Sequence, residues 1–182
     1  TSDDKKVLEI SKKILESVIL VNRPNELASD DALLTDVVKH AIDSYLSEGN
    51  EKPDTILLLQ PTSPFREPKD IESALEQFHN SDFKSLISVS PPIQHPSDFI
   101  FNKDGSWYSC FDNDHRKEGR QNFTEAWFIN GAIYIVDFKY FFQNQQFYSL
   151  DSCEIFKMSI ENSIDIDLPI DLMMANAWIN ER

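Results

Sequence analysis

Apolar residues recur along the chain with two different spacings, and each spacing predicts a different element. Residues 31–49 (DALLTDVVKHAIDSYLSEG) place apolar side chains every three or four positions before a glycine, which predicts an amphipathic helix. Residues 69–80 (KDIESALEQFHN) repeat that spacing. Residues 54–60 (DTILLLQ) are instead a continuous apolar run, which is typical of a strand buried on both faces of a parallel sheet, and residues 84–90 (KSLISVS) predict another buried strand.

The order of the expected elements indicates the fold class. Residues 1–17 predict a helix with Ser2 as its N-cap, and residues 18–22 predict a short strand. Residues 130–137 (NGAIYIVD) predict a strand that leads directly into a short helix. This alternation of strands and helices predicts an α/β fold with a doubly wound, mostly parallel sheet, built as a single domain over residues 1–182.

Residues 91–123 interrupt this alternation. Within them, residues 98–111 (DFIFNKDGSWYSCF) predict a β-hairpin that turns at Asp104-Gly105, because such a pair favours the tight turns that join antiparallel strands. A polar loop follows the hairpin. We therefore expect an irregular region inserted into the α/β domain.

The composition excludes several classes of function. The formal net charge of −14 argues against a nucleic-acid partner, since binding to nucleic acid needs a basic surface. No apolar run approaches the roughly 18 residues of a membrane span, so we expect no membrane partner. The two cysteines, Cys110 and Cys153, are too few for a disulfide framework, so we expect reduced thiols and a cytoplasmic protein.

The last expected strand carries closely spaced carboxylates. Residues 163–167 (SIDID) predict a strand and residues 169–181 a closing helix. Side chains alternate along a strand, so Asp165 and Asp167 should share one face. Two neighbouring carboxylates repel each other unless one is neutral or a cation lies between them, and Mg²⁺ commonly takes one or two carboxylates together with phosphate oxygens. The pattern of Asp165 and Asp167 fits either a metal site or a solvated strand edge. Asp171 instead suits the first turn of the helix.

Two further segments place polar side chains near the ends of expected strands, where open α/β sheets bind ligands. Gln60 directly follows an apolar strand, and Arg66 offers a fork of donors suited to carboxylate or phosphate. Asn130 opens a later strand with Tyr134 on the same face, and Gly131 permits close backbone approach. A structural role is equally open for both segments: a rigid connection for the first, and a strand start with a core tyrosine for the second.

Five segments in one order carry a resemblance to a known family. The segments are RPNELASDD (23–31), LLLQPTSPFR (57–66), SLISV (85–89), NGAIYI (130–135) and SIDIDLPIDL (163–172). In that order they resemble the acylneuraminate cytidylyltransferases, or CMP-sialic acid synthetases, and the likeness runs over essentially the whole chain. Each segment alone is a weak signal, but five in register form a specific pattern.

The resemblance implies a reaction, a cofactor and an assembly. The family joins CMP from CTP to a nine-carbon 2-keto sugar acid of the sialic acid type and releases pyrophosphate. It implies a Rossmann-like nucleotidyltransferase fold, a Mg²⁺ ion and a homodimer whose contact includes an arm at about residues 91–123. The sugar acid stays open among sialic, legionaminic, pseudaminic and related nonulosonic acids.

The resemblance also implies roles for particular residues. Asp165 and Asp167 look like the metal-binding, catalytic aspartates. Arg120 resembles a contact of the sugar carboxylate, and Arg23 resembles an arginine near the cytosine. Taken together, the substrate-binding residues implied by the resemblance are Arg23, Gln60, Ser63, Arg66, Arg120, Asn130 and Tyr134.

The chain departs from the family pattern at its beginning. The family starts with a strand and a loop of Gly, Ser and Lys that grips the triphosphate, whereas this sequence starts at Thr1 within a helical pattern. We therefore expect that the chain lacks roughly the first βαβ unit. The alternative to an enzyme is then a catalytically incomplete fragment that acts as a dimerising or sugar-acid-binding module.

Overall fold

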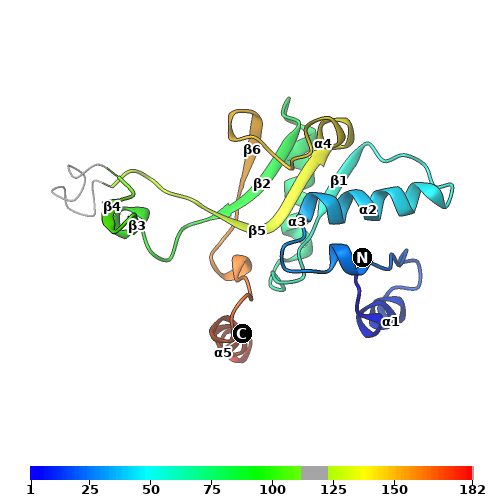
Figure 1. Ribbon diagram of the computed structural model, residues 1–182, viewed down its shortest axis with the longest axis horizontal. Coiled ribbons are helices and arrows are strands. Elements are labelled where there is room, and N and C mark those ends of the chain that lie inside the picture. Colours follow the sequence, from blue (N-terminus) through cyan, green and yellow to red (C-terminus); the bar gives the residue numbers. More distant parts are fainter. Residues whose placement is uncertain (112–122, 182) are drawn as a thin grey trace. The chain divides into compact units, whose positions relative to one another are not determined.

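The computed structural model describes residues 1–111 and 123–181 (Figure 1). It divides into two compact units, and each has its own packing. The first unit comprises Thr1–Ile56 and Val136–Ser149, and the second comprises Leu57–Ile135 and Leu150–Arg182.

The N-terminal helix α1 (Lys5–Ile14) begins later than the sequence predicts. The carboxylate of Asp4, not the hydroxyl of Ser2, caps it by accepting the Lys6 N–H at 2.7 Å. Ser2 is held elsewhere, because its backbone forms an isolated β-bridge with Asn22. The predicted strand at residues 18–22 is therefore wrong, since one bridge is too little pairing to make a ladder.

Two further helices of the first unit follow the sequence pattern. Helix α2 (Leu34–Ser47) buries Val37 and Val38, as its apolar spacing predicts. Helix α4 (Phe138–Asn144) begins where the Asp137 carboxylate accepts the Tyr140 N–H at 2.8 Å. Aromatic side chains around α4 pack on one another: Phe138, Phe141, Phe142 and Phe147.

A four-stranded sheet has the strand order β1-β5-β2-β6 (Figure 1). Its strands are β1 (Thr55–Leu58), β2 (Ser85–Ser90), β5 (Phe128–Asp137) and β6 (Cys153–Lys157), and β2 runs parallel to β6. Every residue of β2 is buried, which confirms the prediction of a buried strand at residues 84–90. The sequence pattern missed β6, because a short strand at the end of the sheet with charged residues has no continuous apolar run.

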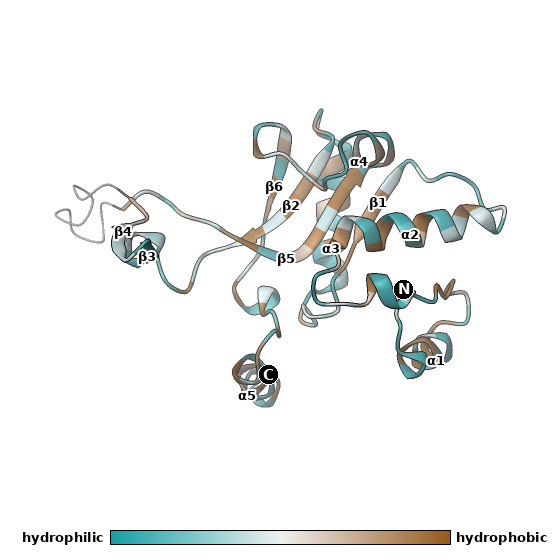
Figure 2. Ribbon diagram, viewed as in Figure 1, coloured by the Kyte–Doolittle hydropathy of each residue, from teal (hydrophilic) through white to brown (hydrophobic). Residues whose placement is uncertain are grey.

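Helix α3 (Pro68–His79) packs against β2 and β6 and completes the core of the second unit. A reciprocal capping box between Glu67 and Asp70 fixes its first turn. Figure 2 shows that β5 is hydrophobic along much of its length. The buried core joins α3, β2 and β5 with the residue after β6, and it consists of Ala74, Phe78, Leu86, Ala132, Ile133, Ile135 and Met158.

The irregular middle region contains the expected hairpin. Strands β3 (Ile100–Lys103) and β4 (Ser106–Ser109) pair antiparallel. Asp104 and Gly105 both have positive φ, 53° and 82°, as a tight hairpin turn requires. The prediction of a turn at this pair is confirmed.

The predicted strand at residues 163–167 is wrong. A single 3-10 turn (Glu161–Ser163) is followed by extended chain without a strand partner. Its one backbone bond to the loop after β1, from Ile166 N–H to Thr62 O at 2.8 Å, cannot make a ladder. Helix α5 (Pro169–Glu181) then closes the chain, as predicted. None of the helices in the described residues is long and apolar enough to cross a membrane.

Candidate active site

The candidate site lies in the second unit, where the loop after β1 meets the segment before α5. The bond from Ile166 N–H to Thr62 O joins the two segments directly. Next to it, the hydroxyl of buried Ser63 donates to Asp165 Oδ1 at 3.5 Å, a long contact at the outer limit of hydrogen bonding. Residues that are about 100 positions apart in the sequence therefore line one place.

The two aspartates predicted to bind metal lie close together. Asp165 is half-buried and Asp167 is exposed. The negative charge of Asp165 raises the pKa of the Asp167 carboxyl, and burial and the charge of Asp171 raise it further. The mutual repulsion that the sequence suggested is thus present, and a cation between the two carboxylates would relieve it.

Asp171 has a structural part in this arrangement. It lies in the first turn of α5, and its carboxylate accepts the N–H groups of Asp167 at 3.1 Å and Leu168 at 2.7 Å. Its oxygen therefore satisfies backbone donors ahead of the helix and fixes the chain at Asp167. The interpretation of Asp171 as a residue of the helix start is confirmed.

A metal ion at this site would have two protein carboxylates. The described residues contain no group of three or more His, Cys, Asp or Glu side chains placed to hold a metal ion. Asp165 and Asp167 suit a Mg²⁺ ion whose other ligands are water and substrate phosphate, because Mg²⁺ often binds proteins through one or two carboxylates.

Gln60, Arg66 and Gly131 form one packed group beside the loop. Gly131 has φ +71°, and a Cβ built there would lie 2.7 Å from Gln60 Oε1. The close approach predicted at this glycine is therefore present, and the group that approaches is the Gln60 amide. Arg66 donates to the carbonyls of Ala132 at 2.7 Å and Gln60 at 3.1 Å. Burial lowers the pKa of the Arg66 guanidinium.

Asn130, like Ser63, is almost completely buried among the described residues that the resemblance assigns to substrate. Its side chain is 1% exposed. Its Oδ1 accepts from Ser88 Oγ at 2.6 Å and from Ala132 N–H at 3.1 Å, and its Nδ2 donates to Ser163 Oγ at 2.9 Å. The amide thus links β5 to β2 and to the segment that carries Asp165.

The remaining residues predicted to bind substrate are Tyr134, Arg23 and Arg120. Tyr134 is half-buried on β5, four positions after Asn130. Arg23 belongs to the first unit, where its Nη2 donates to the Thr1 carbonyl at 3.1 Å. Arg120 lies outside the described residues. The assignment of these residues to substrate stays a prediction.

Sequence reasoning missed several polar residues that hold the site together. Ser88 lies inside a fully buried strand, and Asn162 donates to the Asp70 carboxylate at 3.0 Å. Ser163 accepts from Asn130 and donates to the Ser159 carbonyl. The only local signal was a serine within an apolar run, because a buried hydroxyl needs a hydrogen-bond partner.

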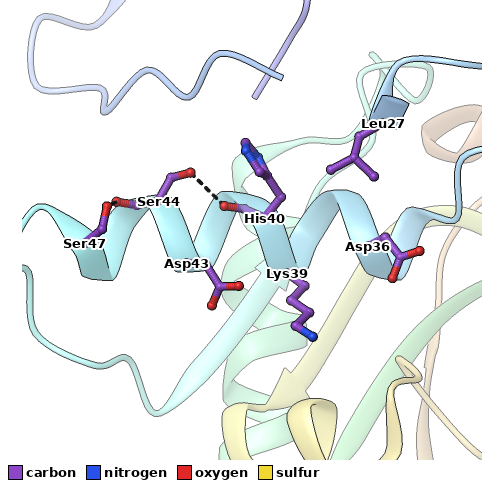
Figure 3. Close-up of a pocket in the computed structure, with 7 residues that line it drawn as sticks. All are labelled: Leu27, Asp36, Lys39, His40, Asp43, Ser44 and Ser47. Carbon is purple, nitrogen blue, oxygen red and sulfur yellow. Dashed lines mark hydrogen bonds between the residues drawn. The ribbon is translucent and has the colours of Figure 1, made fainter. Parts of the chain in front are cut away.

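A surface pocket of about 410 Å³ on α2 lies apart from these residues in the sequence and belongs to the first unit (Figure 3). In Figure 3 the His40 ring points to one side of the helix and the Lys39 side chain to another. The Ser44 hydroxyl donates to the His40 carbonyl within the helix at 2.8 Å. Because its side chains do not converge on one point, we assign this pocket no chemistry.

Comparison with solved structures gives the class of fold. The crystal structure of 4-diphosphocytidyl-2C-methyl-D-erythritol synthase from Anaerococcus prevotii matches 97% of this chain and 78% of that chain, with a TM-score of 0.56. At 14% identity this likeness concerns the fold alone. The chain thus shares the α/β fold of that synthase, which confirms the predicted fold class.

Comparison of sequences gives the family. The CMP-N,N'-diacetyllegionaminic acid synthase of Legionella pneumophila is 32% identical, and the match covers 94% of this chain and 72% of the relative. The pseudaminic acid cytidylyltransferase of Campylobacter jejuni is 29% identical, over 96% of this chain and 74% of the relative. The chain belongs to the acylneuraminate cytidylyltransferase family, as its five segments implied. No family model matches it.

The lengths of the relatives differ. The N-acylneuraminate cytidylyltransferase of Escherichia coli is 33% identical over 155 residues, which are 84% of this chain but 35% of the relative. The chain therefore spans about a third of this relative and nearly three quarters of the Legionella protein.

Proposed function

We propose that the protein is a cytidylyltransferase that joins CMP from CTP to a nonulosonic acid and releases pyrophosphate. The observation that carries the proposal is the close pair Asp165 and Asp167, held beside the loop after β1 in a chain of this family. In the reaction the anomeric hydroxyl of the sugar acid attacks the α-phosphorus of CTP, and the bond to pyrophosphate breaks.

The two aspartates bind Mg²⁺ in this proposal. When bound, the ion neutralises charge on the phosphate oxygens and orients the reacting groups. The protein supplies a pair of carboxylates whose spacing is set before the ion arrives: Asp171 holds the backbone at Asp167, and Thr62 holds it at Ile166. Such prior placement is the main contribution of the protein in phosphoryl transfer, where positioning dominates.

The substrate contacts follow the loop and β5. Ser63 contacts Asp165, Gln60 lies against Gly131 of β5, and Arg66 keeps three of its five N–H donors after binding two carbonyls. We assign Tyr134 and Arg120 to the sugar acid and retain Arg23 for the cytosine. The sugar is a nonulosonic acid, the class that is named for the relatives from Legionella, Campylobacter and Escherichia.

The assembly in this proposal is a homodimer. Large apolar side chains are exposed on the hairpin of β3 and β4 and along α5, where a second copy can cover them. We also place the protein in the cytoplasm, since Cys110 and Cys153 are both free thiols, as is usual in a reducing compartment.

A module that binds the sugar acid or dimerises without turnover is the second candidate. It is favoured by the glycine content, because no two of the four glycines lie close enough to form a phosphate-binding loop. The two candidates differ in turnover but share the sugar acid as ligand.

Pyrophosphate release tests both candidates. The natural full-length protein is mixed with CTP, Mg²⁺ and sialic, legionaminic or pseudaminic acid in turn, with Asp165→Asn as the inactive control. We expect release with at least one acid and little with the variant. No release with any acid, together with binding of one of them by calorimetry, would identify the module instead.

A further inference from the structure

The segment that carries the two aspartates is not part of the sheet, so something other than a strand ladder must fix it. Several hydrogen bonds hold residues 159–171 in the second unit. Ile166 and Asp165 bond to the loop after β1, Asn162 donates to Asp70 at the start of α3, and Ser163 accepts from Asn130. Of these, only the bond from Asn130 reaches the buried interior of the sheet.

Asn130 is suited to hold this segment because its amide is fully engaged and cannot turn freely. Ser88 Oγ donates to its Oδ1 and accepts the Ile133 N–H at 2.8 Å, so both serine and asparagine are fixed by β5 itself. Both side chains are 1% exposed. A buried network in which each polar atom is satisfied is rigid, because breaking one bond leaves a desolvated group.

The fixed amide of Asn130 donates to Ser163, which lies just before the two aspartates Asp165 and Asp167 in the sequence. Ser163 accepts from Asn130 Nδ2 at 2.9 Å and donates to the Ser159 carbonyl, so its hydroxyl is held from two sides. Asp165 follows only two residues later. A shift at Ser163 must therefore move Asp165 or break the bond from Ile166 to Thr62.

We infer that Asn130 is a positioning residue, which acts through Ser163 to place Asp165 and Asp167, rather than a contact of the sugar. Both polar atoms of its side chain are occupied by protein groups: Oδ1 accepts from Ser88 and Ala132, and Nδ2 donates to Ser163 and to the Met158 sulfur. Its consequence for turnover rests on the proposed function. The placement itself does not, so it can be tested without any substrate.

Amide hydrogen exchange of the metal-free full-length protein tests the placement. Ser163→Ala removes the acceptor of Asn130 Nδ2 and leaves both aspartates intact. We expect exchange at Ile166, Asp167 and Leu168 to become about fivefold faster, the effect of losing one neutral hydrogen bond. Ser163→Thr keeps the hydroxyl and should restore protection.

The matched control is Ser85→Ala. Ser85 is a fully buried serine on the same strand as Ser88, but its ladder partner is Cys153 of β6 rather than the metal-binding segment. The Ser85→Ala substitution should leave hydrogen exchange at Ile166, Asp167 and Leu168 unchanged. If Ser163→Ala does not fold, Asn130→Asp is the test variant instead. It keeps the side-chain shape but lacks the N–H donor to Ser163.

Metal binding and kinetics give two further measurements. Titration with Mn²⁺, a paramagnetic stand-in for Mg²⁺, should show a dissociation constant about fivefold higher in Ser163→Ala. In the pyrophosphate assay, Ser163→Ala should lower kcat while KM for the sugar acid stays constant, since Asn130 and Ser163 position the two aspartates and do not contact the sugar. A higher KM with unchanged exchange and unchanged Mn²⁺ affinity would overturn the inference.

These measurements separate the inference from the proposed function. Faster exchange and weaker Mn²⁺ binding support the positioning role even if the wild-type protein releases no pyrophosphate, a result that would count against the cytidylyltransferase alone. Unchanged exchange and unchanged Mn²⁺ affinity in both Ser163→Ala and Asn130→Asp would overturn the positioning role, even in an active enzyme.

Discussion

The interior of the sheet and the surface of the second unit both depart from the usual distribution of side chains in a globular protein. The interior contains polar side chains, and the surface exposes large apolar ones. Inside, between β2 and β5, Ser88 and Asn130 are almost completely buried and hydrogen-bonded. Outside, apolar side chains stand in solvent: Trp107 of the hairpin is 69% exposed and Met173 of α5 is 67% exposed. Both departures need an explanation, because polar burial costs free energy and exposed apolar clusters invite association.

The comparison teaches that the two regions have different tasks. A buried polar network is kept where it fixes the geometry of nearby groups, and this one leads to the metal pair. An exposed apolar surface is kept where a partner covers it, and both the hairpin and α5 have several such residues. Four predictions test this division, in order of decreasing effect.

The largest effect is expected at the end of the buried network. Asp165→Asn or Asp167→Asn should lower turnover roughly 100-fold or more, because each removes a charged ligand of the metal. Thermal unfolding should be nearly unchanged, since neither carboxylate lies in the apolar core. Asp151→Asn, which removes an exposed acid outside the site, is the control; near-normal rates in both site variants would remove the metal role.

The next largest effect is expected on the free energy of unfolding, through the close packing of Gly131 of β5 against Gln60. Gly131→Ala should destabilise the protein by about 2–4 kcal/mol, because its Cβ would clash with Gln60 and its φ is positive. Gly49→Ala has a similar φ of +82° with nothing within 4 Å, so it isolates the conformational part, about 1–2 kcal/mol. Midpoints of denaturant unfolding measure both. Equal losses would mean that Gln60 moves aside freely.

The exposed region should respond in association and not in folding. Trp107→Ser is expected to raise the dissociation constant of the dimer about 30-fold, since exposed tryptophans are frequent anchors of interfaces. Stability of the monomer should change by less than about 0.5 kcal/mol. Sedimentation over a dilution series measures the first quantity. Ser109→Ala on β4 serves as the control, and an unchanged dimer in Trp107→Ser would take the hairpin out of the interface.

The smallest effect is expected at the join between the site and α5. Asp171→Ala removes the acceptor of two backbone N–H groups and should cost about 1 kcal/mol, the usual value of a helix cap. Asp171→Asn retains an oxygen acceptor and should recover about half of that loss. Thermal denaturation distinguishes the two variants, and equal stability of all three proteins would show that water replaces this carboxylate.

Much of the local structure followed from the sequence alone. The period of the apolar residues predicted α2 and α3, the continuous apolar run at residues 54–60 predicted β1, and Asp104-Gly105 predicted the hairpin turn. These features depend on neighbours within a few residues, so a local pattern is enough. The close pair Asp165 and Asp167 was also visible, because its members are only two residues apart.

Only the tertiary structure decided what holds that pair. The extended segment before α5 lacks the neighbour that would make it a strand, although its pattern suits one. Ser88 and Asn130 are 42 residues apart, and Ser63 and Asp165 are 102 apart. Their bonds exist because folding brings distant segments together, and no periodicity within the sequence records which buried hydroxyl will meet which amide.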